Sequence, residues 1–177
     1  MLISILIGFV SIIGIFVLIV ALRPSNFCIT RSISIAAPSV VVFEQVNNLH
    51  RYQAWNPFSK LDPQAKHFFA GPQAGIGASL AWAGNKQMGK GKLTVAESQP
   101  NELVRYQLEF LKPFKATNVA EFTFKPNGPK TVVEWSMTGK NNFIFKAVGL
   151  FMNCDKMIGG MFEQGLANLK AVSEATS

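Results

Sequence analysis

The chain has 177 residues, a net charge of +7 and two cysteines. This length accommodates one domain with a sizeable core and a short appendage, which excludes a large multidomain protein. The lysines are spread through the chain, and no recognised nucleic-acid-binding motif accompanies them, so we expect no nucleic-acid partner. The basic charge fits two interpretations: a surface that faces anionic lipid headgroups, and an ordinary solvated surface.

The first 22 residues are strongly apolar. Leu2 to Leu22 contains no charged residue and is about as long as a helix that crosses a hydrocarbon core of roughly 30 Å. A cleaved signal peptide is the alternative, but a basic n-region and a small-residue cleavage site are missing. We therefore predict a transmembrane anchor over residues 1–22, with its apolar span at 2–22, and a linker over 23–26. Arg23 and Arg31 follow the span, which favours a single-pass protein with a cytoplasmic domain.

Alternation of apolar and polar residues from Phe27 to Ile35 predicts a strand, and Ala36 to Pro38 end it. Ser39 can cap a helix that extends through Leu49, and residues 50–58 indicate a short helix or turn. Six short strands are then predicted, at 66–70, 79–83, 92–98, 103–111, 116–125 and 130–138. The last two are separated by Pro-Asn-Gly at 126–128, which is a strong hairpin signal.

Residues 84–92 read GNKQMGKGK and partly match a nucleotide-binding phosphate loop. The match fails at Gly91, where a Ser or Thr hydroxyl should bind magnesium. A phosphate loop also needs a helix after it, whereas a strand is predicted here. We therefore interpret this stretch as a glycine-rich turn between two antiparallel strands.

The C-terminal segment has helical periodicity. Its apolar residues recur every three or four positions, at Ile158, Phe162, Leu166 and Leu169. Three glycines, at 159, 160 and 165, each cost about 1 kcal/mol relative to Ala in a helix. Close approach of the helix to the sheet, close approach to a ligand, and simple tight packing are the three explanations that remain open.

These elements predict an α+β fold in which one long helix covers a curved seven-stranded antiparallel sheet. Read by alternation, one face of the later strands is apolar and includes Trp82, Tyr106, Phe122 and Trp135. The opposite face carries charged and polar residues such as Arg105. We expect the apolar face to meet the C-terminal helix.

The chain resembles the START-like, birch-pollen-allergen-like helix-grip superfamily, specifically the bacterial SRPBCC proteins known as polyketide cyclases or dehydrases. The resemblance extends from about Phe27 to Ala171, within a predicted ligand-binding domain at 27–177. The segments that carry it are RSISIAAPSVVVFEQV, WNPF at 55–58, GPQAGIGASLAWAGN at 71–85 and DKMIGGMFEQGLANLK at 155–170. The apolar N-terminal segment also looks like that of membrane-anchored members.

The resemblance implies an apolar cavity between the sheet and the long helix that holds a lipid or polyketide-like molecule. We expect the ligand to contact the aromatic, Leu and Met positions Trp82, Tyr106, Leu108, Phe110, Phe122, Phe124, Trp135, Met137, Met157 and Met161. The alternative is that these side chains fill a solid core. The leading hypothesis is thus a membrane-anchored binding protein for a hydrophobic small molecule.

Catalysis is the second hypothesis, as an enzyme of the cyclase or dehydratase type. It needs a polar group in the cavity, for which Glu97, Tyr106 and His67 are the candidates, although no catalytic residue is assigned. The third hypothesis is a membrane-tethered interaction module without a ligand.

Metal and cofactor binding have no support in the sequence. Cys28 and Cys154 lie far apart, and neither has His or Cys at metal-ligand spacing, so we expect buried free thiols. Asp62, Asp155 and Glu163 are scattered and indicate turn, helix-dipole and surface roles. We therefore predict no metal site and no cofactor.

Overall fold

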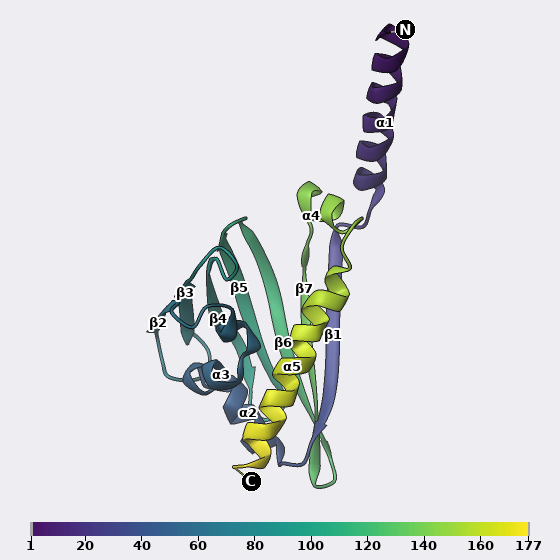
Figure 1. The fold of residues 1–177 in the computed structure, drawn as a ribbon. Helices are drawn as coiled ribbons and strands as arrows, with labels where there is room; N and C mark the ends of the chain where they lie inside the picture. Colours follow the sequence, from purple (N-terminus) through teal and green to yellow (C-terminus); the bar gives the residue numbers. More distant parts are fainter. Residues whose placement is uncertain (1, 177) are drawn as a thin grey trace.

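The computed structural model describes the backbone of residues 2–176 and the side chains of residues 6–176. Its elements in chain order are α1 (Leu2–Leu22), β1 (Asn26–Ile35), α2 (Ser39–Asn47), α3 (Leu49–Trp55), the 3-10 helix η1 (Pro57–Leu61), β2 (Lys66–Ala70), β3 (Ser79–Ala83), β4 (Lys90–Gln99), β5 (Leu103–Lys112), β6 (Ala116–Asn127), β7 (Lys130–Lys140), α4 (Phe143–Val148) and α5 (Cys154–Glu174). The seven strands form one antiparallel sheet in the order β1-β7-β6-β5-β4-β3-β2. The sheet curves around α5, which confirms the predicted helix-grip architecture (Figure 1).

Turn chemistry sets the register of consecutive strands. In the β6–β7 hairpin Asn127 pairs with Lys130, and Gly128 has a φ of 59°, a left-handed conformation that glycine adopts without a steric penalty. The stretch at 84–92 joins β3 to β4, and the Gly84 N–H donates to the Gly89 carbonyl at 2.9 Å. The prediction of a turn between antiparallel strands is therefore confirmed.

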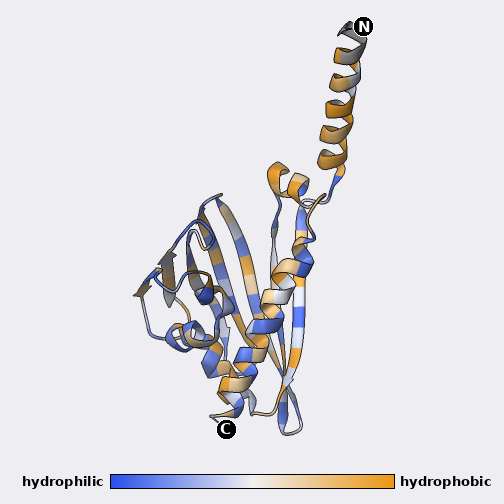
Figure 2. Ribbon diagram, viewed as in Figure 1, coloured by the Kyte–Doolittle hydropathy of each residue, from blue (hydrophilic) through white to orange (hydrophobic). Residues whose placement is uncertain are grey.

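Helix α5 lies across the concave face of the sheet (Figure 1). The Asn153 side chain caps its first turn by accepting from the Lys156 N–H at 2.9 Å. Its buried face includes Phe162, Leu166 and Leu169, and Figure 2 shows the matching alternation of apolar and polar residues along the helix. The apolar residues predicted from the helical spacing therefore do lie on the buried face of α5.

Two of the three α5 glycines permit close approach to other elements. A Cβ at Gly159 would collide with the Arg31 guanidinium of β1, and one at Gly165 would lie 2.6 Å from Cζ3 of Trp135 on β7. No atom outside the helix backbone lies within 4 Å of a Cβ built at Gly160. Contact with the sheet therefore accounts for Gly159 and Gly165 without a ligand.

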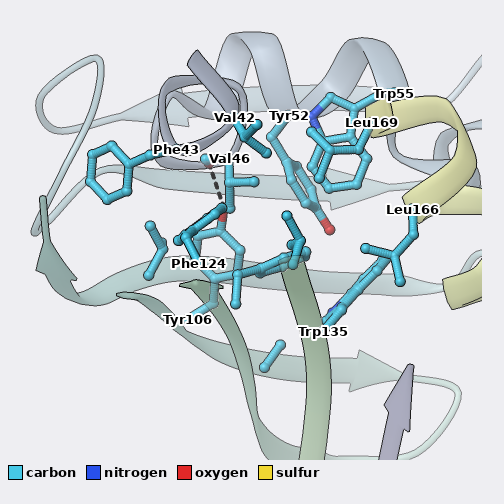
Figure 3. Close-up of a cluster of buried hydrophobic side chains, with 14 of the residues drawn as sticks. Val42, Phe43, Val46, Tyr52, Trp55, Tyr106, Phe124, Trp135, Leu166 and Leu169 are labelled. Carbon is cyan, nitrogen blue, oxygen red and sulfur yellow. Dashed lines mark hydrogen bonds between the residues drawn. The ribbon is translucent and has the colours of Figure 1, made fainter. Parts of the chain in front are cut away.

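The WNPF segment packs into the core beneath α2 and α3. The Trp55 indole N–H donates to the Gln45 carbonyl at 3.0 Å, and Asn56 caps η1 by accepting from the Phe58 N–H at 3.2 Å. The Tyr106 hydroxyl donates to the Val46 carbonyl at 2.6 Å, which connects β5 to α2 (Figure 3). The Trp55 bond thus joins α3 to α2, and the Tyr106 bond joins α2 to the sheet.

The predicted membrane anchor is not supported. In the part of the chain that the structure describes, no helix is long and apolar enough to cross a membrane. The predicted span at 2–22 and the predicted single-pass membrane localisation are therefore corrected.

Helix α1 extends away from the sheet and contacts α4 (Figure 1). Phe16 of α1 stacks on Phe151, in the turn after α4, with ring centroids 6.4 Å apart. Sequence periodicity did not predict α4, a short helix capped by Asn142. Both cysteines are free, as predicted, but Cys28 is exposed because it lies on the outer face of β1.

Candidate functional site

The concave face of the sheet divides into two halves along α5. In the closed half, side chains from the sheet, α2, α3 and α5 fill the space between the layers (Figure 3). Here Trp135 stacks on Phe162 at 4.0 Å with an interplanar angle of 7°, and on Phe122 at 4.8 Å. We define the closed half by its buried sheet residues Val104, Tyr106, Phe122, Phe124 and Trp135.

The open half lies toward the N-terminal end of α5. We define it by Phe27, Trp82, Leu108, Phe110 and Met161, which are only partly buried. The sheet register places Leu108 beside Asn118 of β6 and Leu93 of β4, and places Phe110 beside Gly91. Apolar surface on the concave face therefore stays accessible here.

Gly91 creates space for an aromatic pair in the open half. A Cβ on Gly91 would lie 2.6 Å from Cη2 of Trp82 and 2.6 Å from the Glu109 carbonyl oxygen. The Trp82 ring lies over this glycine and meets Phe110 edge-on, with centroids 6.0 Å apart. Gly91, the residue at which the phosphate-loop match fails, thus leaves room for the Trp82 ring.

The ten predicted contact residues fall into three groups. Tyr106, Phe122, Phe124, Trp135 and Met137 are buried. Trp82, Leu108, Phe110 and Met161 are partly buried and belong to the open half, whereas Met157 is 54% exposed. The structure thus separates the fully buried members of this set from those that keep exposed surface.

The three candidate catalytic groups do not converge. A β-bulge between Val95 and Glu97 shifts the register of β4, and Glu97 then pairs with Arg105, whose guanidinium also binds Glu121 at 2.7 Å on the outer face. His67 shares a hydrogen bond of 3.0 Å with Gln53. These two side chains therefore have structural partners.

Tyr106, the third candidate, donates its hydroxyl hydrogen to a backbone carbonyl. Burial, followed by the neighbouring charge of Tyr52 when that residue ionises, raises the pKa of Tyr106 well above its ordinary value. The phenol is therefore held protonated in the core, where it anchors α2.

An ion-pair cluster fixes α5 at the edge of the sheet. Arg31 of β1 binds Asp155 at 3.0 Å and Glu163 at 2.8 Å, one turn on either side of Gly159. Hydrogen bonds from Asp155 and then Glu163 raise the pKa of the Arg31 guanidinium. The cluster positions the helix segment that borders the open half.

Two hollows lie elsewhere on the surface. The larger, of about 480 Å³, is lined by Val40, Phe43, Glu44, Asn47, Asn48, Arg51, Ala74, Pro100 and Asn101. The smaller, of about 290 Å³, is lined by Leu49, His50, Phe69, Ala70, Gly71, Pro72, Gln73 and Ser79. Residues of α5 line neither hollow, so both are separate from the open half.

The fold and the concave apolar face define a helix-grip α+β domain. Over residues 26–174 the chain matches the family described as polyketide cyclase / dehydrase and lipid transport, and it belongs to that family. This confirms the superfamily that the sequence motifs indicated. Comparison with curated proteins yields no match.

Solved structures share the fold. Protein CV1439 from Chromobacterium violaceum is 16% identical, with a TM-score of 0.60 over 86% of this chain and 99% of its own. Protein MLL2253 from Mesorhizobium loti is 14% identical, with a TM-score of 0.62 over 85% and 99%. Major latex-like protein 151 from Panax ginseng is 11% identical, with a TM-score of 0.60 over 85% and 99%. At these identities the similarity shows the fold alone.

Sequence reasoning missed two residues of the concave surface. Phe27 lies two positions before Ile29, so the alternation along the strand could have predicted that it faces the same side. Asn118 occupies an inward position between Leu108 and Gly139, and a polar residue in an apolar series was the available signal.

Proposed function

We propose that this protein binds a hydrophobic small molecule, a lipid or polyketide-like compound, on the open half of its concave face. The observation that carries the proposal is the partial exposure of Trp82, Leu108 and Phe110, which are neighbours on the concave face of the sheet. The family description, which includes lipid transport, supports the same class of ligand.

The energetic basis is the removal of apolar surface from water. Each 100 Å² of apolar surface covered contributes about 2.5 kcal/mol before the entropic cost of association. The edge-on pair of Trp82 and Phe110 offers a flat aromatic surface, and Met161 on α5 offers an adaptable one. A ligand of this class needs no charged partner to bind there.

The first experiment is to purify the full-length chain under native conditions and to identify retained small molecules by mass spectrometry. An identically treated unrelated protein shows which compounds carry over non-specifically. We expect a specifically enriched lipid or polyketide. If no apolar compound is retained and added lipids do not bind either, the proposed function is refuted.

Adjacent residues on opposite faces of β5 supply a matched pair of variants. Phe110 contributes to the open half, whereas Leu111 points outward and is 55% exposed. We expect Phe110→Ala to weaken binding of the retained compound by about tenfold, since an aromatic ring contributes at least 1.4 kcal/mol when fully covered. Leu111→Ala should bind as wild type does.

A further inference from the structure

The open half contains one polar side chain on β6, that of Asn118. It faces the same side as Ala120 and Phe122, and the register places it between Leu108 of β5 and Gly139 of β7. Its neighbour on one side is therefore a leucine, and on the other a glycine beyond which lies Phe27 of β1. The amide thus lies within an otherwise apolar surface.

Asn118 is largely buried as a residue, with 8% of its surface exposed. Among the described residues its side chain makes no hydrogen bond, and its amide atoms are not among the fully buried unpaired polar atoms, so they keep a small contact with solvent. Buried amides normally have a hydrogen-bond partner, since removing one from water without compensation is unfavourable. An unpaired amide on a ligand-accessible face therefore needs an explanation.

Gly139 determines how the amide lies. A Cβ at Gly139 would collide with Oδ1 of Asn118 and would lie 2.8 Å from both its Cγ and Cε1 of Phe27. The amide therefore rests directly over the glycine, beside the Phe27 ring. Any larger residue at this position would displace the amide, so the glycine holds it in one place.

The chemistry of the amide limits what it can recognise. A primary amide is neutral and both donates and accepts, so it pairs well with a ketone, ester or hydroxyl oxygen. Trp82, Leu108 and Phe110 carry no charge that would compensate an ionised headgroup. Arg31 of β1 is already bound by Asp155 and Glu163, and Lys112 at the end of β5 is exposed to solvent.

We propose that Asn118 is the polar anchor of the binding surface and that the ligand is a hydrophobic molecule with an uncharged carbonyl or hydroxyl oxygen. This inference rests on the proposed function. Apolar contacts with the open half supply affinity, and the amide selects ligands that carry an oxygen at one position.

The test compares two probes that differ by one hydroxyl, naphthalene and 2-naphthol. Both are titrated into ¹⁵N-labelled full-length protein, and the side-chain NH₂ signals of Asn118 are assigned by their loss in Asn118→Leu. We expect 2-naphthol to shift these signals and to bind about five- to tenfold more tightly than naphthalene, the usual worth of one neutral hydrogen bond. Asn118→Leu should bind the two probes equally.

Thr117→Leu is the matched control, since Thr117 is the adjacent residue on the outer face of β6. It should keep the preference for 2-naphthol. Equal binding of both probes to wild type, with unmoved Asn118 signals, would overturn the anchor and leave the proposed function standing. Failure of both probes to bind would overturn the anchor, and the proposed function would fall with it only if the protein also retained no apolar compound and bound no added lipid. Because Asn118→Leu removes an unpaired buried amide, we expect that variant to fold.

Discussion

Substituting each α5 glycine by alanine tests the packing of this helix. In isolation Gly→Ala stabilises a helix interior by about 1 kcal/mol. At Gly165 the new Cβ would lie 2.6 Å from the Trp135 ring and 2.9 Å from Cδ of Pro57. Trp135 cannot yield easily because it stacks on Phe162 at 4.0 Å. Overpacking of this kind costs about 1–3 kcal/mol, so after the gain in helix propensity we expect a net destabilisation of up to about 2 kcal/mol.

Gly160 supplies the matched control within the same helix. Its Cβ would meet no atom within 4 Å, so Gly160→Ala should stabilise the protein by about 0.5–1 kcal/mol. The stability of Gly159→Ala should lie between those of Gly165→Ala and Gly160→Ala. The flexible Arg31 guanidinium can move away from the new Cβ, but this movement weakens its ion pairs.

The assay is urea unfolding of the full-length variants, followed by circular dichroism, with midpoints compared at constant slope. Gly165→Ala should lower the midpoint and Gly160→Ala should raise it. If Gly165→Ala raised the midpoint as much as Gly160→Ala, close contact between α5 and Trp135 would be refuted.

Three further predictions concern the sheet and its buried tyrosines. Tyr106→Phe leaves the Val46 carbonyl without its donor and should lower the free energy of unfolding by about 1–2 kcal/mol in urea titrations. Stability should fall as pH rises above about 10, because Tyr52 and Tyr106 ionise in the unfolded chain while burial raises their pKa in the fold; a flat thermal-denaturation profile from pH 9 to 11 would contradict this. Gly91→Ala should displace Trp82, lower the melting temperature and weaken binding of 2-naphthol, whereas unchanged Trp fluorescence would argue against that displacement.

The β-bulge in β4 shows where simple alternation fails. By period alone Glu97 shares a face with Leu93 and Val95 and would enter the concave side. The bulge inserts one residue and turns Glu97 outward, where Arg105 pairs with it. A bulge depends on how two strands pair, so the periodicity of one strand alone does not predict it.

The sequence likewise did not predict that the concave face divides into a closed half and an open half. Trp135 and Trp82 both read as inward aromatic residues, yet the first is buried and the second partly exposed. What separates them is that Trp55 and Phe162 pack on Trp135, whereas Trp82 packs on Phe110 and Gly91. Contacts of Trp135 with residues 80 and 27 positions away in the chain decide this.

The sequence by itself determined the strands, the hairpin at 126–128, the long amphipathic helix and, through its motifs, the superfamily. These features depend on residues within a few positions of one another, because side chains alternate along strands and recur every 3.6 residues along helices. Only the tertiary structure decided which inward side chains became core, where Glu97 points and that the Asn118 side chain makes no hydrogen bond among the described residues. Those outcomes depend on packing and register between distant segments, for which local periodicity carries no information.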